Sequence, residues 1–198
     1  MEKPSNPKTA AKALVPEPLL RGMTRDTSIE HLLGTPIEMT HPAERQLLAW
    51  VLPPWQRPEV WNVARKRAFI EGIFLGLGTG SYVVHAPDWD ANGTKPMSGW
   101  LIDGQQRISA IRDFVRDDLV IFDGVRYSDI DTITRRRRFL SQTFSYTELS
   151  YAPDEQRLKT LYERLNFGGM GHTAADLQRL SDTPALPITS APTGACPR

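Results

Sequence analysis

The segment from Leu101 to Ile111 constrains the fold of this chain more than any other. Its first residues are apolar, a polar and glycine-containing run follows at 103–107, and apolar residues then recur at helical spacing. This order predicts a short strand that turns directly into the N-terminus of a helix. The segment is therefore expected to form a strand–turn–helix unit.

The other predicted elements follow a mixed order. Strands are predicted at 47–52, 81–85, 99–102, 119–122 and 144–151, and helices at 29–33, 62–77, 104–117, 133–142, 153–165 and 173–180. Helices lie between strands, and residues 86–98 resemble a polar hairpin loop, so we expect an α+β fold. It should form a single domain over residues 26–180. Residues 1–25 are predicted to be a disordered arm, and residues 181–198 a proline-rich tail.

Composition excludes several classes of protein. The formal net charge is +1, so no field of the whole protein attracts nucleic acid. Arginine outnumbers lysine, which fits phosphate binding but follows equally from GC-rich coding. Cys196 is the single cysteine, so an intramolecular disulfide cannot form. The N-terminus lacks the apolar core of a signal peptide, and the longest apolar stretch is too short to span a bilayer, so we expect a cytoplasmic protein without a membrane partner.

The polar run at 103–107 is suited to binding a phosphate. A helix N-terminus offers free backbone N–H groups to an anion, and Gly104 permits close approach to the backbone. The amides of Gln105 and Gln106 can donate hydrogen bonds, and the guanidinium of Arg107 can make a bidentate contact. Asp103 can orient an arginine or hold a metal ion through water. Alternatively, Asp103 is an N-cap that forms a capping box with Gln106.

A second segment, Pro54 to Trp61, places Arg57 between two tryptophans in a loop stiffened by prolines. Such a loop can direct Arg57 at a fixed point, while Trp55 or Trp61 offers a stacking face. In the alternative interpretation, both tryptophans belong to the core and Arg57 pairs with a surface carboxylate.

A third segment runs from Leu165 to Thr173 and contains Asn166 and glycines at 168, 169 and 171. These glycines permit close approach of the backbone to a ligand. The alternative is an ordinary turn between two helices. The arginine run at 135–138 covers a whole helical turn, so we interpret it mainly as a solvated face, with nucleic-acid contact as the alternative.

Taken in order, these three segments resemble the domain of unknown function 262. The resemblance covers about residues 27–180 and implies a fold similar to the ParB/sulfiredoxin group. It also implies the nucleotide-hydrolysing part of a modification-dependent restriction system. The implied nucleoside triphosphate site consists of Gln56, Arg57, Asp103, Gly104, Gln105, Gln106 and Arg107, closed by the Asn166 segment. Asp103, Arg107 and Arg57 are the expected catalytic residues, with Mg²⁺ as cofactor.

The sequence departs from this family in two respects. Related defence proteins continue into a nuclease domain, which this sequence is expected to lack, and the catalytic cysteine of sulfiredoxin has no counterpart in the site. A short chain of this kind suggests a phage or mobile element. Three functions remain open. They are an NTPase coupled to DNA or to a nuclease partner, a nucleotide-gated DNA-binding module, and an interaction protein that acts on a host defence protein without hydrolysis.

Overall fold

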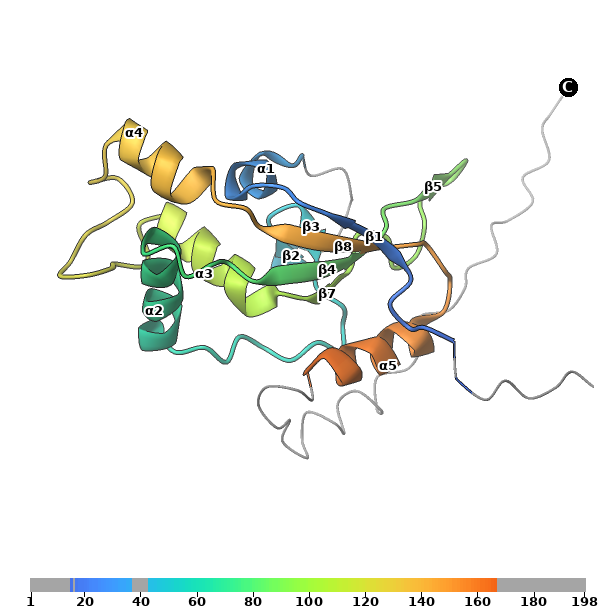
Figure 1. The fold of residues 1–198 in the computed structure, drawn as a ribbon. Helices are drawn as coiled ribbons and strands as arrows, with labels where there is room; N and C mark the ends of the chain where they lie inside the picture. The colour runs from blue at the N-terminus through green and yellow to red at the C-terminus, as the bar shows by residue number, and fades with distance from the viewer. Residues whose placement is uncertain (1–14, 16, 37–42, 167–198) are drawn as a thin grey trace, which may run out of the picture.

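A mixed four-stranded sheet forms the centre of the computed structural model, which describes residues 15, 17–36 and 43–166 (Figure 1). The strand order is β1 (Gly22–Arg25), β8 (Ser145–Leu149), β4 (Ser81–His85) and β7 (Leu101–Asp103). The central pair, β8 and β4, is parallel, whereas β1 and β7 run antiparallel to their neighbours.

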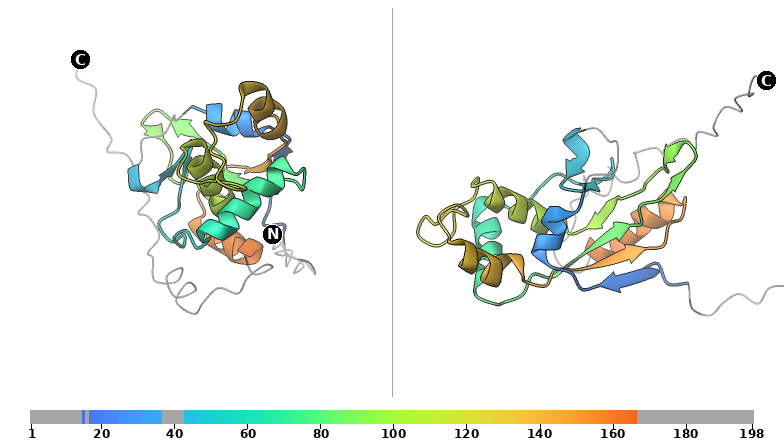
Figure 2. Two further views of the ribbon diagram at one scale, coloured as in Figure 1. Left: turned by 90° about the vertical axis from the view of Figure 1, so that its left-hand side faces the viewer. Right: turned by 90° about the horizontal axis from the view of Figure 1, so that it is seen from above.

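Helices surround this sheet and gather mostly at one end of it. They are α1 (Ile29–Gly34), α2 (Val63–Phe74), α3 (Gln105–Val115), α4 (Thr132–Arg135) and α5 (Glu155–Asn166), with a 3-10 turn at Ala43–Arg45 and a π-helix at Arg136–Leu140 that continues α4. Seen from above, α2, α3 and α4 lie at one end of the sheet (Figure 2). Two small hairpins pair β2 (Gln46–Leu47) with β3 (Trp50–Val51) and β5 (Trp89–Asp90) with β6 (Gly93–Thr94).

Successive side chains of β4 point to opposite faces of the sheet, and a hydrophobic core lies on each face. Tyr82 and Val84 belong to the larger core, which contains the apolar faces of α1, α2 and α3. Val83 belongs to the second core, which is covered by α5. Because α5 and α3 pack on different faces, the end of β7 lies between them.

The structure confirms the predicted α+β class and many of the element positions. The sequence indicates Asn62 as the cap of α2 and leaves Thr27 or Ser28 as the cap of α1. In the structure, the side chains of Asn62 and Ser28 accept the capping hydrogen bonds. The similarity to the ParB/sulfiredoxin fold stays a prediction. The helix expected at 173–180 and the tail at 181–198 lie outside the described residues, as do residues 1–14 of the expected arm.

Four expectations need correction. Residues 22–25 are not part of a disordered arm, because they pair with β8. The apolar run at 47–52 is a hairpin rather than one strand, since Leu48 at the turn has a positive φ of 56°. Residues 119–122 form only an isolated bridge between Ile121 and Val125. Helix α2 ends at Phe74 rather than at residue 77, because Gly76 leaves the helical conformation with a φ of 76°.

Within the described residues, no helix is long and apolar enough to cross a membrane.

His85 connects the end of β4 to the start of α5. Its ring is 1% exposed, Nδ1 lies 2.9 Å from the carbonyl oxygen of Met97, and Nε2 accepts a hydrogen bond from the Ala152 N–H. A carbonyl can only accept, so Nδ1 carries the proton and the ring is neutral. Burial lowers the pKa of His85 below its ordinary value of 6.5, and it outweighs the opposing effects of the Met97 carbonyl and the Asp88 charge.

This environment predicts a pH-dependent stability. The unfolded chain binds the proton more readily than the folded protein, so the stabilisation by the neutral ring is complete above pH 6.5 and is lost as the pH falls toward the lowered pKa. The unfolding free energy should fall by at most about 1.4 kcal/mol per pH unit through this group. Denaturant unfolding between about pH 8 and pH 5 should show a steeper loss in the wild type than in His85→Gln. Parallel curves for the two proteins would contradict this assignment.

Candidate functional site

A cavity of about 200 Å³ lies where the N-terminus of α3, the loop after Pro53 and the C-terminal end of α5 meet. All eight residues predicted for the nucleotide site line it, although they come from three separate stretches of the sequence. The lining residues are Gln56, Arg57, Trp61, Arg65, Asp103, Gly104, Gln105, Gln106, Arg107, Tyr162, Leu165 and Asn166.

Gly104 allows β7 to turn into α3 directly against the neighbouring strand. It is the N-cap residue of α3, has a φ of 103°, and provides no side-chain cap. A Cβ at this position would lie 2.4 Å from the Cβ of Tyr82 on β4, a distance that real structures do not permit. Only glycine therefore fits, and the N–H groups of the first helical turn have no side-chain acceptor from the N-cap residue.

Asp103 and Arg107 form an ion pair along the start of α3. Arg107 Nη2 lies 2.7 Å from Asp103 Oδ2, and both side chains are about a third exposed or less. The capping-box interpretation of Asp103 and Gln106 is therefore wrong. Asp103 lies one residue before the N-cap, where its carboxylate pairs with Arg107 instead.

Gln106 connects α3 to the loop that carries Arg57. Its Oε1 accepts hydrogen bonds of 3.0 Å from the backbone N–H groups of both Val60 and Trp61. These two donors determine which amide atom is the oxygen. The Nε2 atom is buried and has no hydrogen-bond partner among the described residues.

Two further atoms of cavity-lining residues share this property. Within the described part of the chain, Gln56 Oε1 and Arg107 Nε are also buried without a hydrogen-bond partner. A buried polar atom that lacks a partner costs about 1–3 kcal/mol. Three such atoms around one cavity indicate that the site is adapted to something other than stability.

The cavity carries an excess of positive charge. Arg57, Arg65 and Arg107 line it, whereas Asp103 is the one carboxylate among the described residues that do so. Arg57 is half-buried, and its guanidinium makes no hydrogen bond or ion pair to any residue that the structure describes. The surface carboxylate partner that the alternative interpretation gave to Arg57 is thus not found within these residues. The arrangement favours an anionic ligand.

The two tryptophans of the loop have different roles. Trp55 is 1% exposed and packs against Trp100 and Tyr162, so it is a core residue and offers no free stacking face. Trp61 lines the cavity, with the guanidinium of Arg65 5.0 Å from its ring centre. Sequence reasoning missed Arg65, which lies in the first turn of α2.

The third wall of the cavity belongs to α5. Tyr162 is 4% exposed and is held by its ring contact with Trp55, while Asn166 donates from Nδ2 to the Tyr162 carbonyl. Tyr162 and Leu165 were not predicted as site residues, since they look like an ordinary apolar helix face. The glycines at 168, 169 and 171 lie outside the described residues.

The described residues contain no group of three or more histidine, cysteine, aspartate or glutamate side chains that could hold a metal ion.

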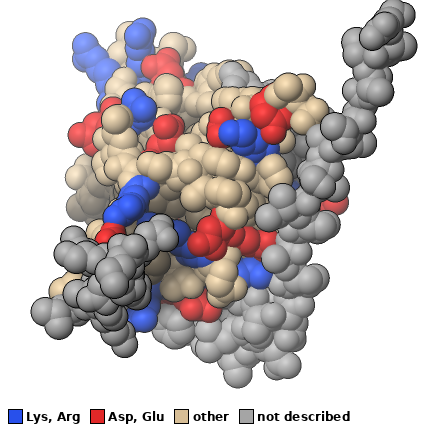
Figure 3. Space-filling view, turned by 90° about the vertical axis from the view of Figure 1, so that its right-hand side faces the viewer, with Lys and Arg blue, Asp and Glu red and all other residues tan. Residues whose placement is uncertain are grey.

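The surface of the domain is mixed in charge. On the face shown in Figure 3, lysine and arginine side chains are interspersed with aspartate and glutamate. In the arginine run, Arg135 donates to the Ile130 carbonyl and Arg138 to the Phe74 carbonyl, so these two residues bind their own domain.

Comparison with known proteins identifies the family. Residues 39–179, more than half of the chain, match the family described as the GmrSD restriction endonuclease, N-terminal domain. The chain belongs to this family. No curated protein and no solved structure matches it.

Membership in the GmrSD N-terminal domain family confirms the predicted relation to restriction endonucleases. The matched region contains all three segments on which that prediction was based. Similarity to the domain of unknown function 262 stays a prediction.

The geometry at Gly104 leads to a test with a matched control. Gly124 has a similar φ of 107°, but a Cβ there meets nothing within 4 Å. Gly124→Ala should cost only the backbone strain of about 1–2 kcal/mol. Gly104→Ala should cost about 1–3 kcal/mol more, because Tyr82 must move. Denaturant unfolding of both variants measures the difference, and equal losses would show that the close approach is unimportant.

Proposed function

We propose that this domain binds a nucleoside triphosphate in the cavity at the start of α3 and hydrolyses it in the context of DNA restriction. The observation that carries the proposal is the unbalanced positive charge of the cavity, above all the guanidinium of Arg57, which has no ion-pair partner among the described residues. A triphosphate supplies the negative charge that the described residues lack.

The start of α3 is suited to phosphate oxygens. Its first-turn N–H groups and the positive end of the helix dipole favour an anion, and the bare backbone at Gly104 permits close approach. Arg57 and Arg107 come from different segments and can contact the phosphate chain from two directions. Each charge-assisted hydrogen bond contributes about 1.5–3 kcal/mol.

Asp103 has two roles in this proposal. Its Oδ2 orients Arg107, and its carboxylate would hold Mg²⁺ through water together with the phosphate oxygens. A single carboxylate suffices, because Mg²⁺ commonly combines one or two carboxylates with phosphate ligands. When bound, the ion would neutralise charge that develops on the phosphates.

Nucleotide-gated binding of DNA without hydrolysis is the second candidate. The ion pair itself favours it, because Arg107 neutralises Asp103 and so weakens its ability to activate a water molecule. Membership in a family of restriction endonuclease N-terminal domains supports a DNA-related context for both candidates. We propose DNA and a nuclease or host defence protein as the macromolecular partners.

Binding can be tested with Arg57→Ala. Calorimetry with each of the four ribonucleoside triphosphates and Mg²⁺ should show binding to the wild type. The variant should bind roughly tenfold or more weakly, since it loses a charge-assisted contact. Its melting temperature should not change, because Arg57 has no contact of this kind with the described residues. Arg116→Ala, at the opposite end of α3, is the control and should bind normally. Absence of binding by the wild type would refute the proposed function.

Hydrolysis can be tested with Asp103→Asn, which keeps the shape of the side chain and removes its charge. Phosphate release should fall roughly a hundredfold, the usual effect of losing one catalytic electrostatic group. Affinity for the nucleoside triphosphate without Mg²⁺ should stay equal or increase, because the cavity becomes more positive. Equal turnover by both proteins would exclude a catalytic role for Asp103. Binding without any phosphate release by the wild type would favour the gated module.

A further inference from the structure

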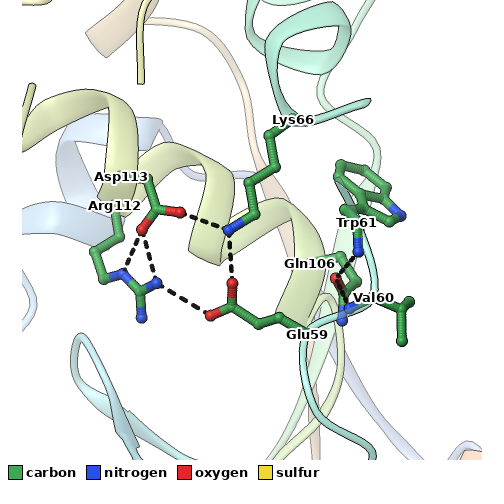
Figure 4. A network of polar contacts seen from close by, with 7 residues as sticks. All are labelled: Glu59, Val60, Trp61, Lys66, Gln106, Arg112 and Asp113. Atoms are coloured by element: carbon green, nitrogen blue, oxygen red, sulfur yellow. Dashed lines mark hydrogen bonds and ion pairs between the residues drawn. The ribbon is translucent and has the colours of Figure 1, made fainter. Parts of the chain in front are cut away.

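Four charged side chains form a closed ring beside the cavity (Figure 4). Lys66 Nζ lies 2.6 Å from Glu59 Oε2 and 2.5 Å from Asp113 Oδ2. On the other side, Arg112 Nη2 lies 3.0 Å from Glu59 Oε1 and 2.7 Å from Asp113 Oδ1. Each carboxylate therefore bridges both cations, and the formal charges of the ring cancel.

The ring connects three segments of the chain. Lys66 belongs to α2, and Arg112 and Asp113 belong to α3, so these three residues join two helices that pack together. Glu59 alone belongs to the loop that carries Arg57. The four side chains are between 12% and 31% exposed, so water screens the ring only in part.

The state of Glu59 agrees with this geometry. Burial by itself would raise the pKa of the Glu59 carboxyl. The hydrogen bond from Lys66 and the charges of Lys66 and Arg112 outweigh that effect and lower the pKa. Glu59 therefore stays ionised at neutral pH and holds the loop as a carboxylate.

Glu59 lies at the point where the loop meets α3. The next two N–H groups, those of Val60 and Trp61, donate to Gln106 Oε1 (Figure 4). The backbone from 59 to 61 is thus attached to α3 twice. The Glu59 side chain pairs with Arg112 of α3, and the Gln106 side chain of α3 binds the backbone of the loop. Arg57 lies two residues before this anchored stretch, and Trp61 lies at its end, so their positions at the cavity depend on it.

We propose that Glu59 is a positioning residue for the phosphate ligand, which it affects by holding the Arg57–Trp61 loop against α3. This inference rests on the proposed nucleotide site. Glu59 does not line the cavity, so its effect reaches the ligand through Arg57 and through the backbone that Gln106 binds. Asp113 has no such connection, since its ion pairs within the described part of the chain join it only to α2 and α3.

This difference supplies a matched pair of variants. Glu59→Gln and Asp113→Asn each remove one negative charge from the same ring. In either variant, Lys66 and Arg112 each keep an ion pair with the remaining carboxylate. A merely structural ring predicts similar consequences for both. A positioning role predicts that Glu59→Gln weakens the binding of Mg²⁺–ATP and of inorganic tripolyphosphate by about tenfold, as for one misplaced charged contact, while Asp113→Asn binds like the wild type. Tripolyphosphate reports the phosphate contacts without a base.

Hydrogen exchange supplies a second readout that needs no nucleotide. The amides of Val60 and Trp61 should exchange about tenfold faster in Glu59→Gln than in the wild type, and at the wild-type rate in Asp113→Asn. Faster exchange in Glu59→Gln alone, with weaker binding, would support the proposal. Equal exchange in the three proteins, or equal losses of affinity in the two variants, would overturn it. If the wild type binds neither probe, the nucleotide site fails, and exchange alone then decides whether Glu59 positions the loop.

Discussion

The close approach of Gly104 to Tyr82 is the constraint on which the site depends. Because no side chain separates them, β7 can pair with β4 and turn into α3 within one residue. Tyr82 cannot easily give way, since its ring packs against those of Trp50, Phe144 and Tyr146 in the larger core. The start of α3 is therefore held against an aromatic cluster of the larger core, which fixes the position of the groups that follow Gly104.

Polar contacts then bring the other segments of the site to this helix. Gln106 and the ion-pair ring around Glu59 attach the loop after Pro53 to α3 from two sides. On the opposite face of the sheet, Trp55 packs against Tyr162 and donates from Nε1 to the buried Glu155, which joins the same loop to α5. One loop thus connects both layers of helices, and the cavity lies where these attachments converge.

The charge distribution separates stability from function. The ring around Glu59 is balanced and linked on every side, as expected for a structural network. The cavity beside it is unbalanced, with Arg57 unpaired and three buried polar atoms unsatisfied within the described residues. In the proposed nucleotide complex, phosphate oxygens would satisfy the unpaired donors and would compete with Asp103 for Arg107.

The sequence by itself determined the α+β class and the cap at Asn62, and it grouped eight residues that line the cavity. Local patterns suffice for these, because capping and strand–helix alternation are properties of neighbouring residues, and the three motifs are typical of one family. Tertiary structure alone decided the ion pair of Asp103 with Arg107, the burial of Trp55 and the ring around Glu59. A side chain near a helix start can either cap it or pair with an arginine, and only the packed neighbours decide between the two. At Gly104, the decisive neighbour is Tyr82, 22 residues earlier in the chain, whose Cβ leaves no room for a capping side chain.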